Sequence, residues 1–275
     1  MYQSGLYQAT SARNKGWFSK AELLKMRLRV PKDLRPVADA YGYYKVSSYP
    51  VYEKDKCIPM GEKKPLSEAQ KLVLAKGRQR MAEQKQELLE RPKKQAIAQA
   101  KSLMAIDNLL ILDTETTGLD GSAEICEIAL INLKKEVVFS SLIKTSVPMS
   151  DEVIGIHGIT NEMVVGAPTW PAVYDQVNSL LADKTVAIYN SEYDVRLIKQ
   201  TCQIYNLEMI KFKAPCVMQI YAQFFGEWSD YRGSYKWQKL AFAAEEFGSK
   251  HIHDAHRATS DCMMTVDVLK GMVNS

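Results

Sequence analysis

The sequence predicts an α/β domain built on a mixed β-sheet with helices on both faces, preceded by a basic, mainly helical region. Two observations carry this prediction. Three strand-like apolar runs separated by short turns occupy residues 109–144, and helix-like and strand-like segments follow them. The composition also shifts near residue 105, from basic helix-forming sequence to apolar runs. We therefore expect two regions, residues 1–105 and 106–275.

The composition restricts the class of protein. The chain has 275 residues, of which 46% are hydrophobic and 25% charged, as in soluble globular proteins. We find no apolar run near the ~18–20 residues that span a bilayer, and no apolar stretch of the secretory-signal kind at the N-terminus. The five cysteines are spread out without a CxxC pair, which argues against a disulfide scaffold and a zinc site. We expect a cytoplasmic protein with no membrane partner.

Charge is divided unevenly between the two regions. Residues 1–105 hold 22 Lys and Arg against 10 Asp and Glu, a net charge of +12, so residues 106–275 carry −8 of the total of +4. A basic region joined to an acidic one indicates a polyanionic partner such as nucleic acid. The simpler alternative is that long basic helices are merely well solvated.

The N-terminal region begins with a short helix. Ser19 and Glu22 fit a capping box, and Pro31 is expected to close the helix that they open. The tyrosine-rich residues 41–60 have the β-propensity of a hairpin but carry prolines, including Pro50. We expect this segment to be irregular.

A long helix then leads to residue 105. Ser67 and Gln70 form a second capping box, and Pro92 is expected to break or kink the helix that follows. Its basic residues are Lys71, Lys76, Arg78, Arg80, Lys85, Arg91, Lys93 and Lys94. They either follow a nucleic-acid backbone or simply solvate a linker helix, and docking onto a protein partner is a further possibility.

The strands of the main domain come first. We expect them over Leu109–Asp113, Ile125–Asn132 and Val137–Lys144, separated by turns at Gly118–Gly121 and Lys134-Lys135. Turns this short make the three strands antiparallel neighbours.

Helices alternate with one more strand in the rest of the chain. We expect a helical region from Ser150, a strand over Thr185–Tyr189, and helices over Tyr193–Asn206, Val217–Phe225, Lys236–Phe247 and Ala255–Val273. An antiparallel three-strand start followed by helix–strand alternation is the ribonuclease-H-like topology.

The run DTETTGL places two acids at the end of the first strand. Asp113 and Glu115 are two positions apart, so they point to the same face. Two neighbouring carboxylates at a buried strand end repel each other, and a divalent cation is the usual way to neutralise them. The alternative is a surface turn at Gly118 with both acids solvated.

Two later segments bring further candidates. Asp194 opens the helix after the Thr185–Tyr189 strand, and Asp261 lies in the last helix, five residues after His256. Four converging carboxylates would require cations, and a pair of Mg²⁺ or Mn²⁺ ions would balance them. Taken singly, each acid also fits a solvated helix position, and the histidine fits a surface site.

Four motifs in this order resemble the DEDDh 3′–5′ exonuclease family, which includes the bacterial proofreading subunit, exonuclease X and the TREX enzymes. The D-x-E-T-T-G-L motif matches Asp113–Leu119, and H-G-I-T matches His157–Thr160. H-N-A-x-F-D is similar to Tyr189–Asp194, and H-x4-D matches His256–Asp261. The resemblance covers about residues 107–273.

The resemblance implies a function and a site. The activity would be the metal-dependent release of nucleoside 5′-monophosphates from a free 3′ end, with single-stranded DNA as the expected substrate. Asp113, Glu115, Asp194 and Asp261 would hold two metals, with Asp113 bridging them, and His256 would be the general base. The residues expected to bind substrate are Thr116, Thr117, Gly118, Leu119, His157 and Asn190.

The second motif departs from the family pattern at three positions. Tyr189 stands where histidine is usual, Ser191 replaces alanine and Tyr193 replaces phenylalanine. Since no metal ligand or base is missing, the departures bear on substrate detail. An exoribonuclease or oligoribonuclease is the alternative enzyme, and a non-catalytic nucleic-acid-binding adaptor the alternative class.

Two further groups of residues lie near these motifs. Glu124 and Glu127 either support the metal ligands or are solvated acids at a strand end, and we favour the second interpretation. The aromatic and basic segment Trp228–Trp237 either stacks on bases or forms a loop, and we expect Trp237 to be buried. The sequence does not indicate an oligomeric state.

Overall fold

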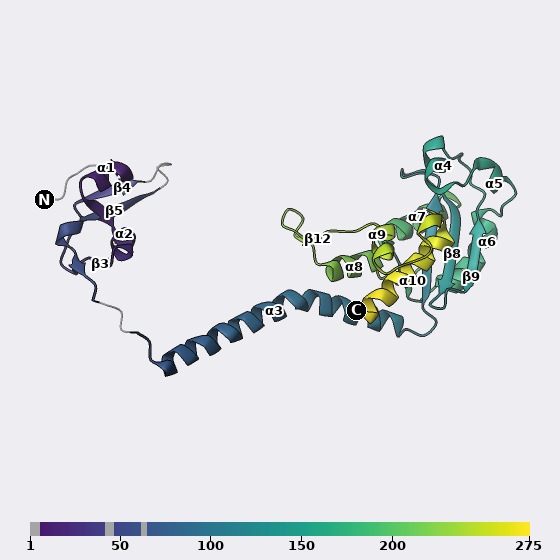
Figure 1. The fold of residues 1–275 in the computed structure, drawn as a ribbon. Helices are drawn as coiled ribbons and strands as arrows, with labels where there is room; N and C mark the ends of the chain where they lie inside the picture. Colours follow the sequence, from purple (N-terminus) through teal and green to yellow (C-terminus); the bar gives the residue numbers. More distant parts are fainter. Residues whose placement is uncertain (1–5, 42–46, 62–64) are drawn as a thin grey trace. The chain divides into compact units, whose positions relative to one another are not determined.

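A computed structural model describes residues 6–41, 47–61 and 65–275, and the chain divides into two compact units, residues 1–78 and 79–275. The long helix α3, Glu68–Met104, passes from the first unit into the second (Figure 1). Among the described helices, none is both long and apolar enough to cross a bilayer. A functional boundary between residues 105 and 106 stays a prediction.

The first unit is a small mixed sheet with two short helices and its own core. Its sheet has the order β1-β4-β5-β2, with β1 parallel to β4 and the other pairs antiparallel. The strands are β1 Leu6–Gln8, β2 Trp17–Ser19, β4 Ala38–Tyr41 and β5 Ser48–Glu53, and β3 Leu28–Arg29 pairs with β6 Ile58–Pro59. The helices are α1 Ala9–Asn14, α2 Lys20–Lys25 and the 3₁₀ helix η1 Lys54–Lys56. Trp17, Ala38 and Val51 are buried together.

The capping box at the start of α2 is confirmed. The Glu22 amide donates to Ser19 Oγ (3.3 Å), and the Ser19 amide donates to Glu22 Oε2 (2.9 Å). The prediction that Pro31 closes this helix is wrong. The helix ends at Lys25, and Arg27 then adopts a left-handed backbone conformation (φ 61°), which redirects the chain before the proline.

The prediction of an irregular segment over residues 41–60 is also wrong, because the whole of β5, Ser48–Glu53, lies within it. Residues 42–46 are outside the described part of the chain. Pro50 lies opposite Asp39 of β4, but the pairing of β5 with β2 begins only at Val51. The missing N–H of Pro50 therefore costs no hydrogen bond to β2.

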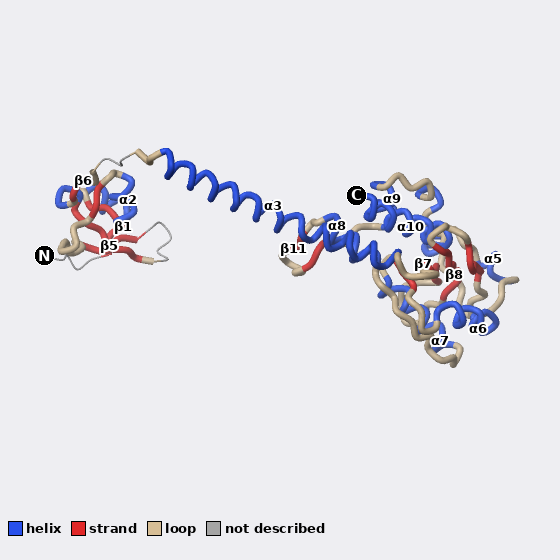
Figure 2. The backbone as a smooth tube through the Cα atoms, turned by 90° about the horizontal axis from the view of Figure 1, so that it is seen from below, coloured by secondary structure: helices blue, strands red, loops and turns tan. Residues whose placement is uncertain are grey.

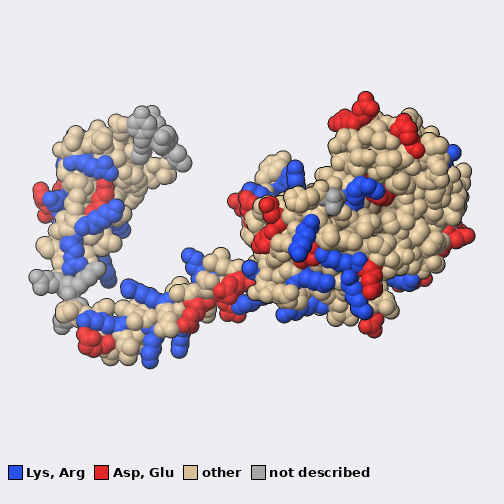
Figure 3. Space-filling model, turned by 45° about the vertical axis from the view of Figure 1, so that its right-hand side comes forward, with Lys and Arg blue, Asp and Glu red and all other residues tan. Residues whose placement is uncertain are grey.

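Helix α3 begins as the sequence predicts. The Ser67 amide donates to Gln70 Oε1 (3.0 Å), and the Gln70 amide donates to Ser67 Oγ (3.2 Å). The helix is not broken at Pro92, because its last turns are fixed in the core of the second unit through Ala96, Ala100 and Leu103. Before Pro92 the helix is exposed, with Lys and Arg interspersed among Glu (Figure 3).

The second unit is built on a four-stranded sheet of order β10-β7-β8-β9. Its strands are β7 Leu110–Thr116, β8 Ile125–Asn132, β9 Val137–Leu142 and β10 Val186–Ile188. The predicted antiparallel pairing of the first three strands is confirmed, and β10 adds to β7 in parallel.

Helices cover both faces of this sheet, as predicted. They are α4 Asp151–His157, α5 Asn161–Val165, α6 Trp170–Leu181, α7 Ser191–Ile204, α8 Val217–Phe225, α9 Leu240–Glu246, α10 Ala258–Asn274 and the 3₁₀ helix η2 Ile252–Asp254. Figure 2 shows α9 and α10 on one side of the strands and α6 and α7 on the other. A short hairpin, β11 Trp228–Ser229 with β12 Ser234–Tyr235, precedes α9 and delays its predicted start at residue 236.

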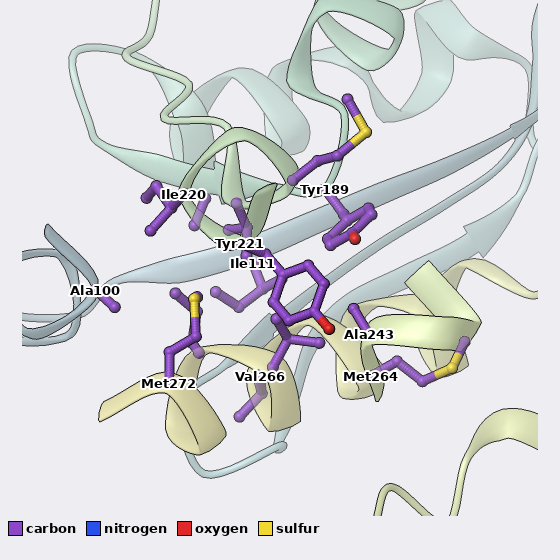
Figure 4. Close-up of a cluster of buried hydrophobic side chains, with 14 of the residues drawn as sticks. Ala100, Ile111, Tyr189, Ile220, Tyr221, Ala243, Met264, Val266 and Met272 are labelled. Carbon is purple, nitrogen blue, oxygen red and sulfur yellow. The ribbon is translucent and has the colours of Figure 1, made fainter. Parts of the chain in front are cut away.

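The alternation of side chains along β7 divides the core in two. Ile111 packs with Tyr221 of α8 and Val266 of α10 on one face (Figure 4). Leu112 packs with Trp170 of α6 and Ile198 of α7 on the other. The result is the ribonuclease-H-like arrangement expected from the sequence, with β7 at its centre.

Candidate active site

Strand β7 holds the acid pair of DTETTGL in place. Asp113 and Glu115 follow the buried residues Ile111 and Leu112 without a change of strand conformation. The pairing of β10 with β7 ends at Leu112, whereas β7 continues to Thr116. The end of β7 that carries Asp113 and Glu115 is therefore not paired with β10. This leaves that side of the strand open to a side chain from another element.

Helix α7 supplies Asp194 to this edge. Asn190 has a left-handed backbone conformation (φ 63°) that turns the chain from β10 directly into the helix. Asp194 is buried in the first turn, and its Oδ1 accepts a hydrogen bond from Thr114 Oγ1 (2.7 Å). The hydroxyl thus fixes one carboxylate oxygen of Asp194 against β7.

Helix α10 supplies Asp261, and the loop before it supplies His256. The His256 amide donates to Asp261 Oδ1 (3.0 Å), so the acid caps the loop that carries the histidine. His256 has a left-handed backbone conformation (φ 65°), which is why α10 begins at Ala258 rather than at the predicted Ala255. Its side chain is exposed.

These side chains meet in one pocket of about 250 Å³, which we call the catalytic pocket. Its lining residues are Asp113, Thr114, Glu115, Tyr189, Asn190, Tyr193, Asp194, Leu240, His256 and Asp261. Carboxylate oxygens of Asp113, Glu115 and Asp261 lie within 4.8 Å of one another. The structure thus brings together all five residues that the sequence predicts to be catalytic.

Burial and mutual repulsion make the charged form of these acids unfavourable. Burial, with Asp194 and Asp261 nearby, raises the pKa of Asp113 well above its ordinary value. Burial also raises the pKa of Glu115 to about 8, of Asp194 to about 7 and of Asp261 to about 6. Such a set of oxygen donors fits a divalent cation, which would offset the repulsion between them.

The expectation that Glu127 and Glu124 are solvated is wrong, because both are buried, with 4% and 1% of their surface exposed. Glu127 lies opposite Glu115 in the β7–β8 register. It accepts hydrogen bonds from Arg257 Nη2 (2.7 Å) and Nε (3.2 Å) and from the Ala258 amide (2.9 Å). Glu127 therefore holds the two residues that follow His256.

Glu124 instead stabilises the turn that follows β7. The Thr117 amide donates to the Glu124 carbonyl, and the Glu124 amide donates to Thr117 Oγ1, both at 2.9 Å. The Glu124 carboxylate accepts hydrogen bonds from Ser146 and from Tyr205. Since the hydroxyl and amide of Thr117 are already engaged, this residue shapes the turn.

A second cavity, of about 380 Å³, borders the catalytic pocket beyond Glu115 and Tyr193. We call it the Leu119 cavity, after a side chain that is 79% exposed at its edge. Thr116, Gly118 and His157 also line it, so four of the residues predicted to bind substrate meet there. Asn190 lines the catalytic pocket instead.

His157 is positioned by hydrogen bonds on both sides of its ring. The Ile159 amide donates to His157 Nδ1 (3.0 Å), which leaves Nε2 to donate to the Thr116 carbonyl (3.3 Å). Burial lowers the pKa of this histidine and favours the neutral ring. His157 thereby braces the end of β7 at the wall of the Leu119 cavity.

The prediction that Trp237 is buried is wrong. Its side chain is 54% exposed, and the Arg232 guanidinium lies 5.7 Å from the centre of its ring. Arg232 lies in the turn of the β11–β12 hairpin. In this hairpin the rings of Trp228 and Tyr235 meet edge to face, with their centres 5.1 Å apart.

Sequence reasoning missed two residues that orient the site. Thr114 stands inside DTETTGL, but its contact with Asp194 spans 80 residues. Arg257 adjoins His256, and its partner Glu127 is 130 residues away. The motif spacing offers no signal for either contact.

The fold and the acidic pocket define a class, the ribonuclease-H-like nucleases, and comparison with known proteins narrows it. The exonuclease family (RNase_T) matches residues 110–269. An uncharacterized exonuclease of Escherichia phage 186 is 41% identical over 172 residues, covering 60% of this chain and 88% of that protein. The DNA polymerase III subunit epsilon of Aquifex aeolicus is 26% identical over 177 residues, covering 61% and 84%.

A solved structure agrees on the fold. A 3′-exonuclease in a complex described as 3′-end specific recognition of histone mRNA stem-loop matches with a TM-score of 0.51 and 21% identity, covering 62% of this chain and 65% of that one. The chain belongs to the exonuclease family, as one of its DEDDh 3′–5′ exonucleases. It is therefore a hydrolytic nuclease.

Proposed function

We propose that this exonuclease removes nucleoside 5′-monophosphates one at a time from the 3′ end of single-stranded DNA, with residues 106–275 as its catalytic domain. The observation that carries the proposal is the catalytic pocket itself. Four carboxyl groups and an exposed histidine line about 250 Å³ at the open end of β7. No other feature of the described residues offers this combination of donors and a base.

We propose two Mg²⁺ or Mn²⁺ ions as cofactors, held by Asp113, Glu115, Asp194 and Asp261. The close approach of three of these carboxylates and the raised pKa values of all four support the fit. When bound, the ions supply positive charge that activates water and stabilises the leaving oxygen of the phosphodiester.

We assign His256 as the general base. Its imidazole accepts a proton from the attacking water, whose oxygen forms the new bond to phosphorus. The bond from phosphorus to the 3′ oxygen of the penultimate nucleotide breaks, and that oxygen takes up a proton. The phosphate leaves with the terminal nucleoside, and the shortened strand keeps a 3′-hydroxyl. The Asp261–His256 backbone hydrogen bond keeps the loop at the pocket.

DNA is the substrate that we favour because a relative of this chain is named a DNA polymerase III subunit. RNA is the second candidate, since the solved relative recognises an mRNA stem-loop. A protein that distinguishes the two sugars must contact the 2′-hydroxyl. Matched 5′-labelled DNA and RNA strands of the same sequence therefore test the choice directly.

The test of the activity uses the full-length protein and a 5′-labelled single strand. We expect stepwise shortening with Mg²⁺ or Mn²⁺, none with EDTA, and recovery when metal is added in excess. A 3′-labelled strand should release its label as a mononucleotide in the first step. Internal cuts, or shortening that persists in EDTA, would contradict the proposal.

We propose that residues 1–105 grip the nucleic acid or a protein partner. Their net charge of +12 and the exposed cations of α3 support this role. Residues 79–275 retain the part of α3 that packs into the second core, so they form the appropriate shortened protein. The shortened protein lacks residues 1–78, which hold 16 of the 22 Lys and Arg of this region. If these residues grip DNA, it should bind long strands more weakly and with a smaller salt dependence, while cleaving short ones normally. Equal binding would defeat the DNA grip.

A further inference from the structure

A third cavity, of about 460 Å³, adjoins the catalytic pocket on the side of α9 and α10. It includes Trp237, after which we name it the Trp237 cavity. The residues that it shares with the catalytic pocket are Tyr189, Asn190, Leu240, His256 and Asp261. The cavity therefore opens directly onto the general base.

The Trp237 cavity and the Leu119 cavity are separate. Among the described residues they have no lining residue in common, and each shares residues with the catalytic pocket. A reaction that removes one nucleotide requires a nucleotide on each side of the phosphate that is cut. If the terminal nucleotide occupies the Leu119 cavity, the penultimate one has the Trp237 cavity available.

The lining of the Trp237 cavity suits a nucleobase. Met218, Ala255 and Met264 contribute apolar surface, and the half-exposed indole of Trp237 is large enough to stack on a base. Aromatic stacking is tolerant of sequence because every base has a π face. Stacking on Trp237 and contact with this apolar surface do not depend on the identity of the base, so the cavity suits any single-stranded base.

Positive charge lies next to this apolar surface. Lys239 lines the cavity, and Arg232 lies over the Trp237 ring at 5.7 Å. Both side chains are exposed. They offset the acids of the catalytic pocket along the path that a phosphate backbone would follow.

The segment that carries Trp237 is anchored from the sheet. The hydroxyl of the buried residue Tyr189 donates to the Gln238 carbonyl (2.9 Å), and the Lys236 amide donates to the Glu227 carbonyl (2.8 Å). Tyr189 occupies the position where the family motif has histidine. The cavity wall is thus held by contacts on both sides of Trp237, which a preformed binding site requires.

We propose that the Trp237 cavity binds the penultimate nucleotide of a single strand, with its base stacked on Trp237 and its phosphate near Lys239. The proposal rests on the proposed 3′–5′ exonuclease activity and adds a subsite to it. The cleavage rate would then depend on the presence of a base on the 5′ side of the cut, whatever the identity of that base.

The test combines a protein change with a substrate change. We compare two 5′-labelled DNA strands, one normal and one with an abasic penultimate residue, and measure the rate of the first cleavage at subsaturating enzyme. The wild-type protein should cleave the abasic strand about 5- to 150-fold more slowly, the range expected from stacking energies. Trp237→Ala should lose a similar factor on the normal strand and nothing further on the abasic one.

Trp228→Ala is the matched control, since it removes an exposed tryptophan of the same hairpin region that does not line the cavity. It should behave as wild type on both strands. Trp237→Phe should keep part of the preference for the normal strand. Circular dichroism checks that each variant is folded, and the wild-type comparison tests the proposal even if Trp237→Ala fails to fold.

The possible results of these assays distinguish a failure of the proposed subsite from a failure of the proposed exonuclease activity. Equal wild-type rates on both strands, or equal losses on both in Trp237→Ala, would overturn the subsite while leaving the exonuclease intact. A wild-type protein that shortens neither strand in the presence of metal would instead overturn the proposed function.

Discussion

Two of the three segments that bring acids to the catalytic pocket, β7 and the start of α10, are built by opposite means. On β7, strand alternation alone sets Asp113 and Glu115 side by side, two residues apart. At the start of α10, the positions of His256 and Asp261 depend on a left-handed residue, a backbone-to-carboxylate hydrogen bond and the distant Glu127. The placement of Asp113 and Glu115 on β7 is therefore a local feature of the chain, whereas the position of His256, our proposed base, depends on tertiary contacts.

Replacing a β7 ligand should have the largest effect. Asp113→Asn keeps the size of the side chain but removes the charge at the centre of the acidic cluster. We expect the cleavage rate to fall by about 10³-fold or more, the scale of several kcal/mol of lost metal-dependent stabilisation. Exposed Asp107, just before the same strand, provides the control Asp107→Asn, which should retain full activity.

The same variant should be more stable than wild type without metal. The raised pKa of Asp113 means that the folded state is stabilised at low pH and loses this contribution as pH rises. The neutral amide avoids that loss, so the melting temperature in EDTA at pH 8 should increase. A decrease would show that the carboxylate stabilises the fold, against our account of the cluster.

Removing the base should have the next largest effect. His256→Ala should lower the cleavage rate by about 10²-fold or more, the usual contribution of general base catalysis, while metal affinity changes little. Exposed His253, three residues earlier, gives the control His253→Ala. Rapid cleavage by the His256 variant would assign the proton transfer to another group.

Loosening the tertiary support of the base should have a smaller effect. Glu127→Gln can still accept the Ala258 hydrogen bond but loses the charge that holds Arg257. We expect about a tenfold lower kcat with little change in KM, because a charge-assisted hydrogen bond contributes about 1.5–3 kcal/mol. Glu127→Asp should recover part of the rate. A loss confined to KM would mean that the pair acts on substrate binding.

The smallest effect concerns protons released by metal. Near pH 7 the pKa values of about 8 for Glu115 and about 7 for Asp194 leave both partly protonated without metal. Metal binding requires their charged forms, so these two acids should release about one to two protons, Asp113 should add to that number, and binding should tighten as pH rises from 6 to 8. Calorimetry in two buffers of different ionisation enthalpy measures this number. Binding with no proton release would place the metal away from these acids.

Much of the fold and site follows from sequence patterns. Apolar sequence predicts β8 over its full length and α8 at its observed bounds, since most residues of both elements are buried. The short hairpin of residues 228–235 and the strand at Pro50 were not predicted, because pairing partners override local propensity there. For the same reason, tertiary contacts bury Glu127 and Glu124 in positions that a sequence pattern assigns to solvent.

The sequence by itself determined which residues we propose to carry the chemistry, because acids, histidine and glycine at motif spacing are fixed by covalent order. It also determined the geometry of Asp113 and Glu115, since a strand repeats every two residues. Only the tertiary structure decided how Asp194 meets Thr114, how Glu127 holds the residues after His256, and that Trp237 lines a cavity beside the base. These contacts join residues far apart in the chain, and their formation depends on the packing of whole helices against the sheet.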